Sequence, residues 1–345
     1  MVERFKKNWA IAELRSEYVM LAIFVLSIFI PLAATKYSLT LFSKVLLFCL
    51  CAWANILLSN YGGMASFAHI SFYGISAYTV AILTTMHDWA FWPAVLIAML
   101  FSFIAAVIYG LVSVRASGRY FFQISIAFLQ LIYLTVRQWP ELTKGTIGIV
   151  NIPAAPFLGT TLTDKKLVFY FTLAVVVLCY LLLKSIVTAP FGLALTGIRD
   201  NQAKMNALGF NVKFQRLVAI VIAEMIAAIG GILWVIINRV ITSENISANW
   251  ATIVMFMCIL GGTKKFEGGV LGALIYVFMS DYLGSVTRRT KLIIGLMYIA
   301  LVMFMPDGIL CTNYKAAVTE FKEKRRKKKA ALAAAKDDSA AKHQS

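Results

Sequence analysis

The polar stretch TAPFGLALTGIRDNQAKMNALGFNVK, residues 188–213, separates two long apolar segments and is too hydrophilic to remain in lipid. Pro190 suits the first turn of a helix, where its missing N–H is not needed, and Gly209 is a natural stop at a helix C-terminus. Between them, four apolar residues have the spacing of one face of a single helix. These four are Leu195, Ile198, Met205 and Leu208, and the other faces carry Arg199, Asp200, Asn201 and Lys204. Such a helix, held outside the membrane between two spans, can lie on a lipid surface or fit its apolar face into a partner's groove.

The composition is that of a polytopic membrane protein. Of 345 residues, 60% are hydrophobic and 14% are charged, whereas a soluble domain is about 45–50% apolar. The net charge of +17 does not indicate nucleic-acid binding, because ten of the 33 Lys and Arg residues lie in 315–342 and most others flank apolar runs. The five cysteines form neither a paired CxxC metal site nor a secreted disulfide pattern. We expect no metal and no cofactor bound by this chain.

About 20 residues cross a bilayer, and on that length the sequence predicts an all-α fold of about ten transmembrane or partly spanning helices. The segment 249–261 is short enough to cross only partly. An even number of spans places both termini on one side, together with the polar connection, and the basic tail assigns that side to the cytoplasm. The helices are expected near residues 18–34, 39–59, 71–86, 90–112, 120–137, 166–187, 214–238, 249–261, 269–284 and 291–306.

The predicted division of the chain has three parts. Residues 1–17 form a cytoplasmic N-terminus, and residues 18–310 form the membrane domain that contains the connection 188–213. The tail 311–345 includes the run KEKRRKKK and has too little apolar content to fold alone. We expect this tail to contact anionic lipid headgroups.

A second informative stretch is NYGGMASFAHISFYGISAYT, residues 60–79. Its Gly62-Gly63 pair should break a helix, since glycine costs about 1 kcal/mol relative to alanine. Unwound backbone inside a membrane protein is tolerated where it is packed in protein or lines a watery cavity, and transporters place such breaks beside the substrate. The alternative is a polar turn whose glycines only let helices approach closely. On the first reading the candidate translocation pathway includes Asn55, Gly63, Ser66, His69 and Ser71.

Both stretches resemble permeases of ABC importers of the branched-chain amino-acid, LivM-type family. The resemblance begins near Asn55, continues through motifs in the family's order and ends near Gly308. Two departures occur in the second stretch, because the family usually has Gln where this chain has Met64 and Gly where it has Ala68. If that Gln contacts the solute in the family, Met64 removes a hydrogen-bonding group from the site. The identity of the substrate is then undetermined, whereas the expected fold is unaffected. The matching motifs in the connection are Phe191-Gly192, Ile198-Arg199-Asp200-Asn201, Ala207-Leu208-Gly209 and Asn211.

The resemblance implies that the chain is a transport subunit and not an enzyme. In the family, a cytoplasmic coupling loop docks onto separate ATPase subunits that use the ATP. It further implies a second, LivH-like permease, an extracytoplasmic substrate-binding protein, a bacterial-type cytoplasmic (inner) membrane, and uptake of amino acids or related small amides or urea. The coupling residues implied here are Leu195, Ile198, Arg199, Asp200, Asn201, Met205, Leu208 and Gly209.

Glu224 lies near the middle of the predicted helix 214–238, where the family usually has a small residue. A charge at the bilayer centre costs a few kcal/mol, so Glu224 must face protein or water, or be protonated. Two roles remain open. Glu224 either belongs to the solute pathway or bonds to a structural partner such as Asn55 or a serine of a neighbouring helix.

The serious rival to an importer subunit is a secondary transporter or channel for a small solute. Such proteins often carry several intramembrane charges or detectable repeats, whereas this chain offers Glu224, with Lys44 as a second candidate. The sequence has no GxxxxGK[ST] motif for holding ATP in a P-loop, and no HExxH or GxSxG motif. An intramembrane enzyme is therefore weakly supported.

Overall fold

The computed structural model describes residues 20–32, 34–116, 118–157, 160–287, 289–304 and 308–309. The predicted N-terminal segment 1–17 and the tail 311–345 lie outside these ranges. Within them the chain is an all-α protein, as predicted. The long helices are Met20–Leu32, α2 (Lys36–Ile56), α3 (His69–Met86), α4 (Phe91–Ser113), α5 (Arg119–Gln138), α7 (Lys165–Thr188), α10 (Val212–Asn238), α11 (Ala248–Gly261), α12 (Phe266–Val286) and α13 (Thr290–Phe304).

These helices correspond to the ten predicted segments, within a few residues at each end. Six of the described helices are long and apolar enough to cross a membrane, namely α2 with its extension to Tyr61, α4, α5, α7, α10 and α12. The helix α11 has 14 residues, which agrees with its prediction as a partial span. Short elements complete the described chain: η1 (Leu57–Tyr61), α6 (Pro140–Thr143), β1 (Pro156–Phe157), β2 (Thr160–Thr161), α8 (Pro190–Asp200), α9 (Gln202–Ala207) and η2 (Ser243–Ile246).

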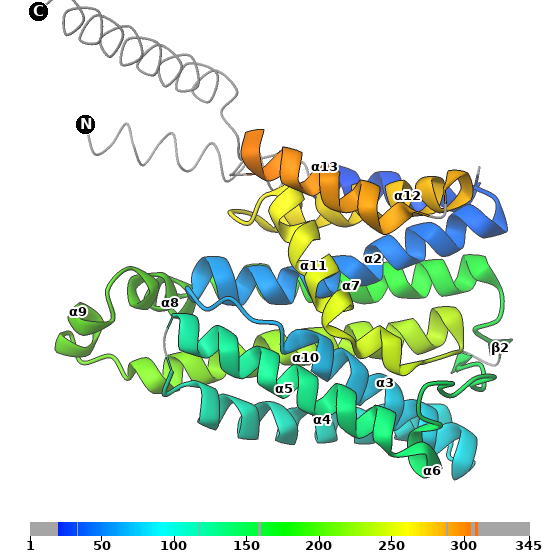
Figure 1. Cartoon of the computed structure of the whole chain (residues 1–345), viewed down its shortest axis with the longest axis horizontal. Coiled ribbons are helices and arrows are strands. Elements are labelled where there is room, and N and C mark those ends of the chain that lie inside the picture. The colour runs from blue at the N-terminus through cyan, green and yellow to red at the C-terminus, as the bar shows by residue number, and fades with distance from the viewer. Residues whose placement is uncertain are drawn as a thin grey trace, which may run out of the picture.

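Helices α2 and α10 form the centre of the molecule (Figure 1). Of their apolar windows, 89% and 78% of residues are buried, against 28% for α4 and 22% for α5. In Figure 1, α3 and α4 lie below α10, α12 and α13 lie above α2, and α11 crosses α2. A helix that is apolar on all sides is suited to a buried position, and α2 and α10 are such helices.

Close approach at the centre depends on glycines. A Cβ on Gly231 of α10 would overlap the backbone carbonyl of Tyr73 on α3. The same relation joins α11 to α12, where Gly261 lies against the backbone of Gly268 and Gly272. Small residues at these crossings bring helix backbones into direct contact, which is how helices associate where the hydrophobic effect offers little drive.

The connection between α5 and α7 is fixed to the opposite end of the molecule from α8 and α9 (Figure 1). Ile149 and Ile241 exchange backbone hydrogen bonds at 2.9 and 3.0 Å, and the Arg239 guanidinium donates to the Ile152 carbonyl at 2.9 Å. The strands β1 and β2 form a small antiparallel pair. The described part of the loop 138–164 is thus anchored to the end of α10.

We expect Gly231→Ala to destabilise the protein by about 1–3 kcal/mol, the cost typical of overpacking, because its methyl group meets the α3 backbone. Gly284→Ala on α12 is the matched control, since nothing lies within 4 Å of a Cβ there, and it should be neutral or raise stability by up to about 1 kcal/mol. Thermal unfolding in detergent measures both. Equal melting temperatures for the two variants would contradict the packing of α10 on α3.

Candidate functional site

The candidate site begins where α2 loses its regular hydrogen-bond pattern. The last turn of α2 widens into the π-helix η1, and the Gly62 N–H donates to the Leu57 carbonyl at 3.1 Å. Gly63 then adopts a φ of +66°, a left-handed conformation that glycine takes without steric cost. From there to His69 the chain is not helical. The predicted break at Gly62-Gly63 is confirmed.

The unwound segment is tied by hydrogen bonds to two helices and is further held by one bond of its own. The Asn55 amide on α2 donates to the Ser66 carbonyl at 3.4 Å, and the Phe67 N–H donates to the Ser125 hydroxyl on α5 at 3.0 Å. The Ala68 N–H donates to the Ser66 hydroxyl at 3.1 Å just before α3 begins. Unwound backbone inside a membrane protein needs such partners, because lipid supplies none.

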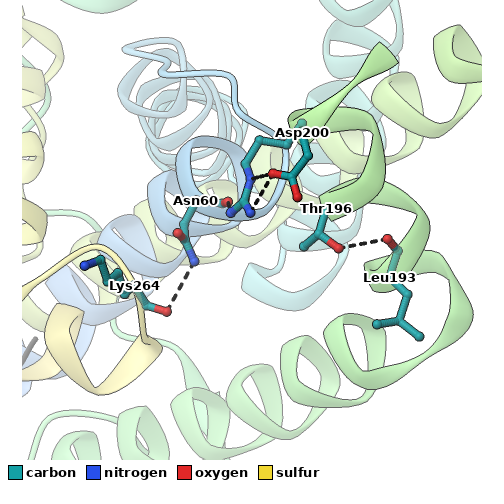
Figure 2. A network of polar contacts seen from close by, with 6 residues as sticks. Asn60, Leu193, Thr196, Asp200 and Lys264 are labelled. Carbon is teal, nitrogen blue, oxygen red and sulfur yellow. Dashed lines mark hydrogen bonds and ion pairs between the residues drawn. The ribbon is translucent and has the colours of Figure 1, made fainter. Parts of the chain in front are cut away.

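The polar connection docks onto this break (Figure 2). Arg199 on α8 donates from Nη1 to the Asn60 carbonyl at 2.6 Å, and its side chain lies against Gly63, where an added Cβ would be 2.7 Å from Arg199 Cγ. The Asn60 amide in turn donates to the Lys264 carbonyl, between α11 and α12, at 3.2 Å. Asp200 fixes the guanidinium through contacts of 2.8 and 2.9 Å from Nη2 and Nε to its Oδ1. We call Asn60, Gly63, Arg199, Asp200 and Lys264 the polar junction.

The prediction of one amphipathic helix over residues 190–208 is wrong. The chain breaks at Asn201, whose backbone is extended and whose side chain accepts the Lys204 N–H at 3.0 Å, capping α9. Pro190 does begin α8, and Gly209, with a φ of +87°, follows α9 in a turn as expected.

The predicted apolar face is divided as a result. Leu195 and Ile198 are fully buried within the permease. Met205 is half-buried, and a Cβ on Gly197 of α8 would meet its sulfur at 2.9 Å. Leu208 is 72% exposed. Leu195 and Ile198 therefore hold the connection to the helix bundle and cannot touch a partner in this conformation, whereas Leu208 and Met205 can.

The other predicted pathway residues lie in the interior. Asn55, Ser66, His69, Ser71 and Glu224 are all buried, and only Gly63 is at the surface. Neither ring nitrogen of His69 and no side-chain oxygen of Ser71 has a hydrogen-bond partner in the described part of the chain. Buried polar atoms without partners are costly, so this interior offers unused hydrogen-bonding capacity to water or to a polar solute.

Of the two roles left open for Glu224, the bond to a structural partner is absent among the described residues. Both carboxyl oxygens are fully buried and have no hydrogen-bond partner among the described residues. The predicted bond to Asn55 is wrong, because Asn55 binds Ser66 instead. Glu224 lies within electrostatic range of Cys51 on α2 and Tyr109 on α4, and Tyr109 is also beside Ser66. The structure thus gathers Glu224 and Ser66 around one tyrosine between α2, α4 and α10.

Met64 and Arg216 form a contact that the sequence alone did not indicate. The Arg216 guanidinium is buried at the start of α10 and donates to the Met64 sulfur at 2.9 Å and to the Ala116 carbonyl at 2.9 Å. Arg216 therefore joins the start of α10 both to Met64 at the break and to the corner between α4 and α5. Asn60 was also missed. An arginine at the start of a predicted span was the available signal for Arg216, and nothing in the sequence distinguished Asn60 from other loop asparagines.

Comparison with known proteins agrees with this arrangement. Residues 37–302 match the family model described as "Branched-chain amino acid transport system / permease component". The chain is 19% identical over 319 residues to the "High-affinity branched-chain amino acid transport system permease protein LivM" of Escherichia coli (strain K12), covering 86% of this chain and 75% of the relative. It is 24% identical over 228 residues to the "Probable branched-chain amino acid transport permease protein LivM" of Methanocaldococcus jannaschii, covering 64% and 66%. No solved structure matches the chain significantly.

Two substitutions to methionine should have opposite effects on stability. Glu224→Met removes a buried carboxyl group that has no hydrogen-bond partner in the described structure, so the variant should be more stable by about 1–3 kcal/mol. Arg216→Met removes a guanidinium with two partners and should be less stable by a similar amount. Melting temperatures in detergent test this pair. A lower melting temperature for Glu224→Met would show that the carboxyl is bonded to a structural partner after all.

Proposed function

The chain belongs to the family of permease components of branched-chain amino acid transport systems, and we propose that it is the transmembrane subunit of an ATP-driven importer of branched-chain amino acids. A permease of this kind carries solute and is not an enzyme. The observation that carries the proposal is the polar junction, in which Arg199 of the connection binds the Asn60 carbonyl where α2 is broken. A helix outside the bundle is thereby joined to the discontinuity inside it.

We assign ATPase docking to the end of the molecule that carries α8 and α9. The side chains exposed there combine apolar and polar groups. Leu193, Leu208, Phe210 and Phe214 are 40–72% exposed, and Asp200 and Asn201 are exposed beside them. An exposed apolar patch with a polar rim is typical of a protein-interaction surface. Because the sequence has no P-loop motif, the ATP is bound by the partner ATPase subunits and no cofactor by this chain.

The junction gives docking a mechanical consequence. A displacement of α8 pulls on the Asn60 carbonyl through Arg199, and Asn60 passes the displacement to the segment between α11 and α12 through Lys264 (Figure 2). The π-helical turn and the left-handed Gly63 are the places where the backbone can absorb the movement. The break therefore converts motion at the ATPase surface into motion of the helices around Ser66 and Glu224.

The orientation and the remaining partners follow from this assignment. The α8–α9 end faces the cytoplasm of a bacterial-type inner membrane, both termini are cytoplasmic, and the basic tail contacts anionic lipid. The opposite end, with the anchored loop 138–164, faces an extracytoplasmic substrate-binding protein. A second, LivH-like permease completes the pathway, since two permease chains with two ATPases form the assembly that the family implies.

Leu208→Asp should abolish the coupling of ATP hydrolysis to solute uptake without unfolding the chain. The residue is 72% exposed, so the substitution leaves packing intact while it places a charge in the proposed ATPase interface. We expect ATP-dependent uptake into proteoliposomes to fall about tenfold or more, with less ATPase co-purifying and an unchanged melting temperature. Ile147→Asp, at a 77% exposed position in the opposite loop, is the control and should bind ATPase normally.

Normal coupling in the Leu208→Asp variant would disprove the docking assignment. The driving force is tested in the same vesicles by supplying ATP and a proton gradient separately. Uptake driven by the gradient alone would show a secondary transporter and end the importer proposal.

A further inference from the structure

A cleft of about 550 Å³ opens at the end of the membrane domain opposite the polar junction. It lies between the first half of α2, the last half of α12, and the ends of α10 and α11 that meet near η2. The volume is within the roughly 300–1,000 Å³ of small-molecule sites. Lys44, Phe48, Trp234, Trp250 and Asp281 contribute to its lining.

Two opposite charges face this cleft from different helices. Lys44 on α2 and Asp281 on α12 are both half-buried and interact electrostatically, but the described structure contains no direct ion pair between them. Asp281 is held by a hydrogen bond from the Tyr37 hydroxyl. Ionisable residues within membrane helices are costly and usually mark a functional path. Lys44 and Asp281 together present one cationic and one anionic group to the same space.

The remaining wall of the cleft is aromatic. Phe48 and Trp250 are stacked with ring centroids 5.3 Å apart, and Trp234 packs edge-on to Trp250 at 5.3 Å. Phe48 and Trp234 are buried, so their rings are rigid surfaces that belong to the core of the bundle. Apolar walls with a few placed polar groups are the usual pattern of a site for a small organic ligand.

We propose that this cleft binds a zwitterionic amino acid with an aliphatic side chain. The carboxylate pairs with Lys44, the ammonium group pairs with Asp281, and the side chain packs on the ring of Trp250. Asp281 cannot neutralise Lys44 through direct contact in this conformation, and a zwitterion supplies the missing counter-charge to each. The inference rests on the proposed function and adds to it a solute site on the side where solute enters.

Position along the helices supports an entry site. The α2 residues that line the cleft precede the π-helical turn on the same helix, and α12 runs from the Lys264 segment of the polar junction to Asp281. A solute held between α2 and α12 is therefore in contact with the two helices whose other ends meet at the junction. Displacement of the junction changes the separation of Lys44 from Asp281, which would release the solute toward the interior.

The first test is protection of a thiol in the assembled transporter. Ser280→Cys places a thiol in the cleft, whereas the native Cys49, Cys51, Cys179 and Cys258 are buried. We expect millimolar leucine to slow the labelling of this introduced thiol by a membrane-impermeant maleimide at least fivefold. N-acetyl-leucine, which lacks the ammonium group, and leucinamide, which lacks the carboxylate, should not protect. Thr163→Cys, exposed outside the cleft, is the control and should be labelled equally with and without leucine.

The second test is leucine uptake with saturating binding protein. Lys44→Met and Asp281→Asn should each reduce uptake about tenfold while ATP hydrolysis continues, and Lys44→Arg should retain most of the uptake. Lys166→Met, an exposed lysine at the same end of the molecule, should transport normally. If the charge variants fail to assemble, the protection test still decides, since it leaves both charges in place.

Three results would overturn the proposal. The first is that leucine does not change the rate at which the Ser280→Cys thiol is labelled. The second is that the Lys44→Met and Asp281→Asn variants take up leucine normally. A Ser280→Cys thiol that reacts alone but is unreactive in the complex, with or without leucine, would show that another subunit covers the cleft. Failure of the proposed function looks different, because the unmodified complex would then take up no leucine under ATP.

Discussion

The backbone between Leu57 and Ala68 leaves the α-helical pattern within a membrane protein, and its buried polar groups must find partners within the chain because lipid supplies none. This constraint determines the arrangement around it. Asn55 and Ser125 bind the unwound segment, Arg199 binds the Asn60 carbonyl in the π-helical turn, and Asn60 reaches the segment between α11 and α12. The break is thus the point at which hydrogen bonds, in addition to packing, join α2, α5, α8 and the segment between α11 and α12.

Packing and polar contact have separate roles in the molecule. Some helices cross in direct backbone contact at a glycine. Gly231 on α10, for example, lies against the backbone of Tyr73 on α3, so these two helices are closely packed. The polar junction and the Lys44–Asp281 cleft, by contrast, are held by a few directional contacts at opposite ends of α2 and α12. The helix core and these two polar regions are therefore stabilised by different kinds of contact.

The buried carboxyl of Glu224 shows a cost that folding alone does not explain. An acid in the centre of α10 with no hydrogen-bond partner among the described residues lowers stability, yet it lies near Tyr109 and Ser66, where that part of the structure holds further buried polar atoms without partners. Such groups are tolerated where water or solute satisfies them during function. In the described structure the carboxyl of Glu224 supplies no hydrogen bond that supports the fold.

The sequence by itself determined the helices, the break and the family. Apolar runs of bilayer length predicted all ten segments, because helix is the form in which an isolated run satisfies its backbone in lipid. Gly62-Gly63 predicted the break, because glycine lowers helix stability locally.

Only the tertiary structure decided what the side chains do. Periodicity placed Leu195 and Leu208 on one face, but the extended backbone at Asn201 sends Leu195 into the core and Leu208 to the surface. Likewise the contacts of Arg199 with Asn60 and of Arg216 with Met64, and the placement of Lys44 and Asp281 in one cleft, bring together residues more than 100 positions apart. No local pattern encodes such pairs, because they form only when the helices pack.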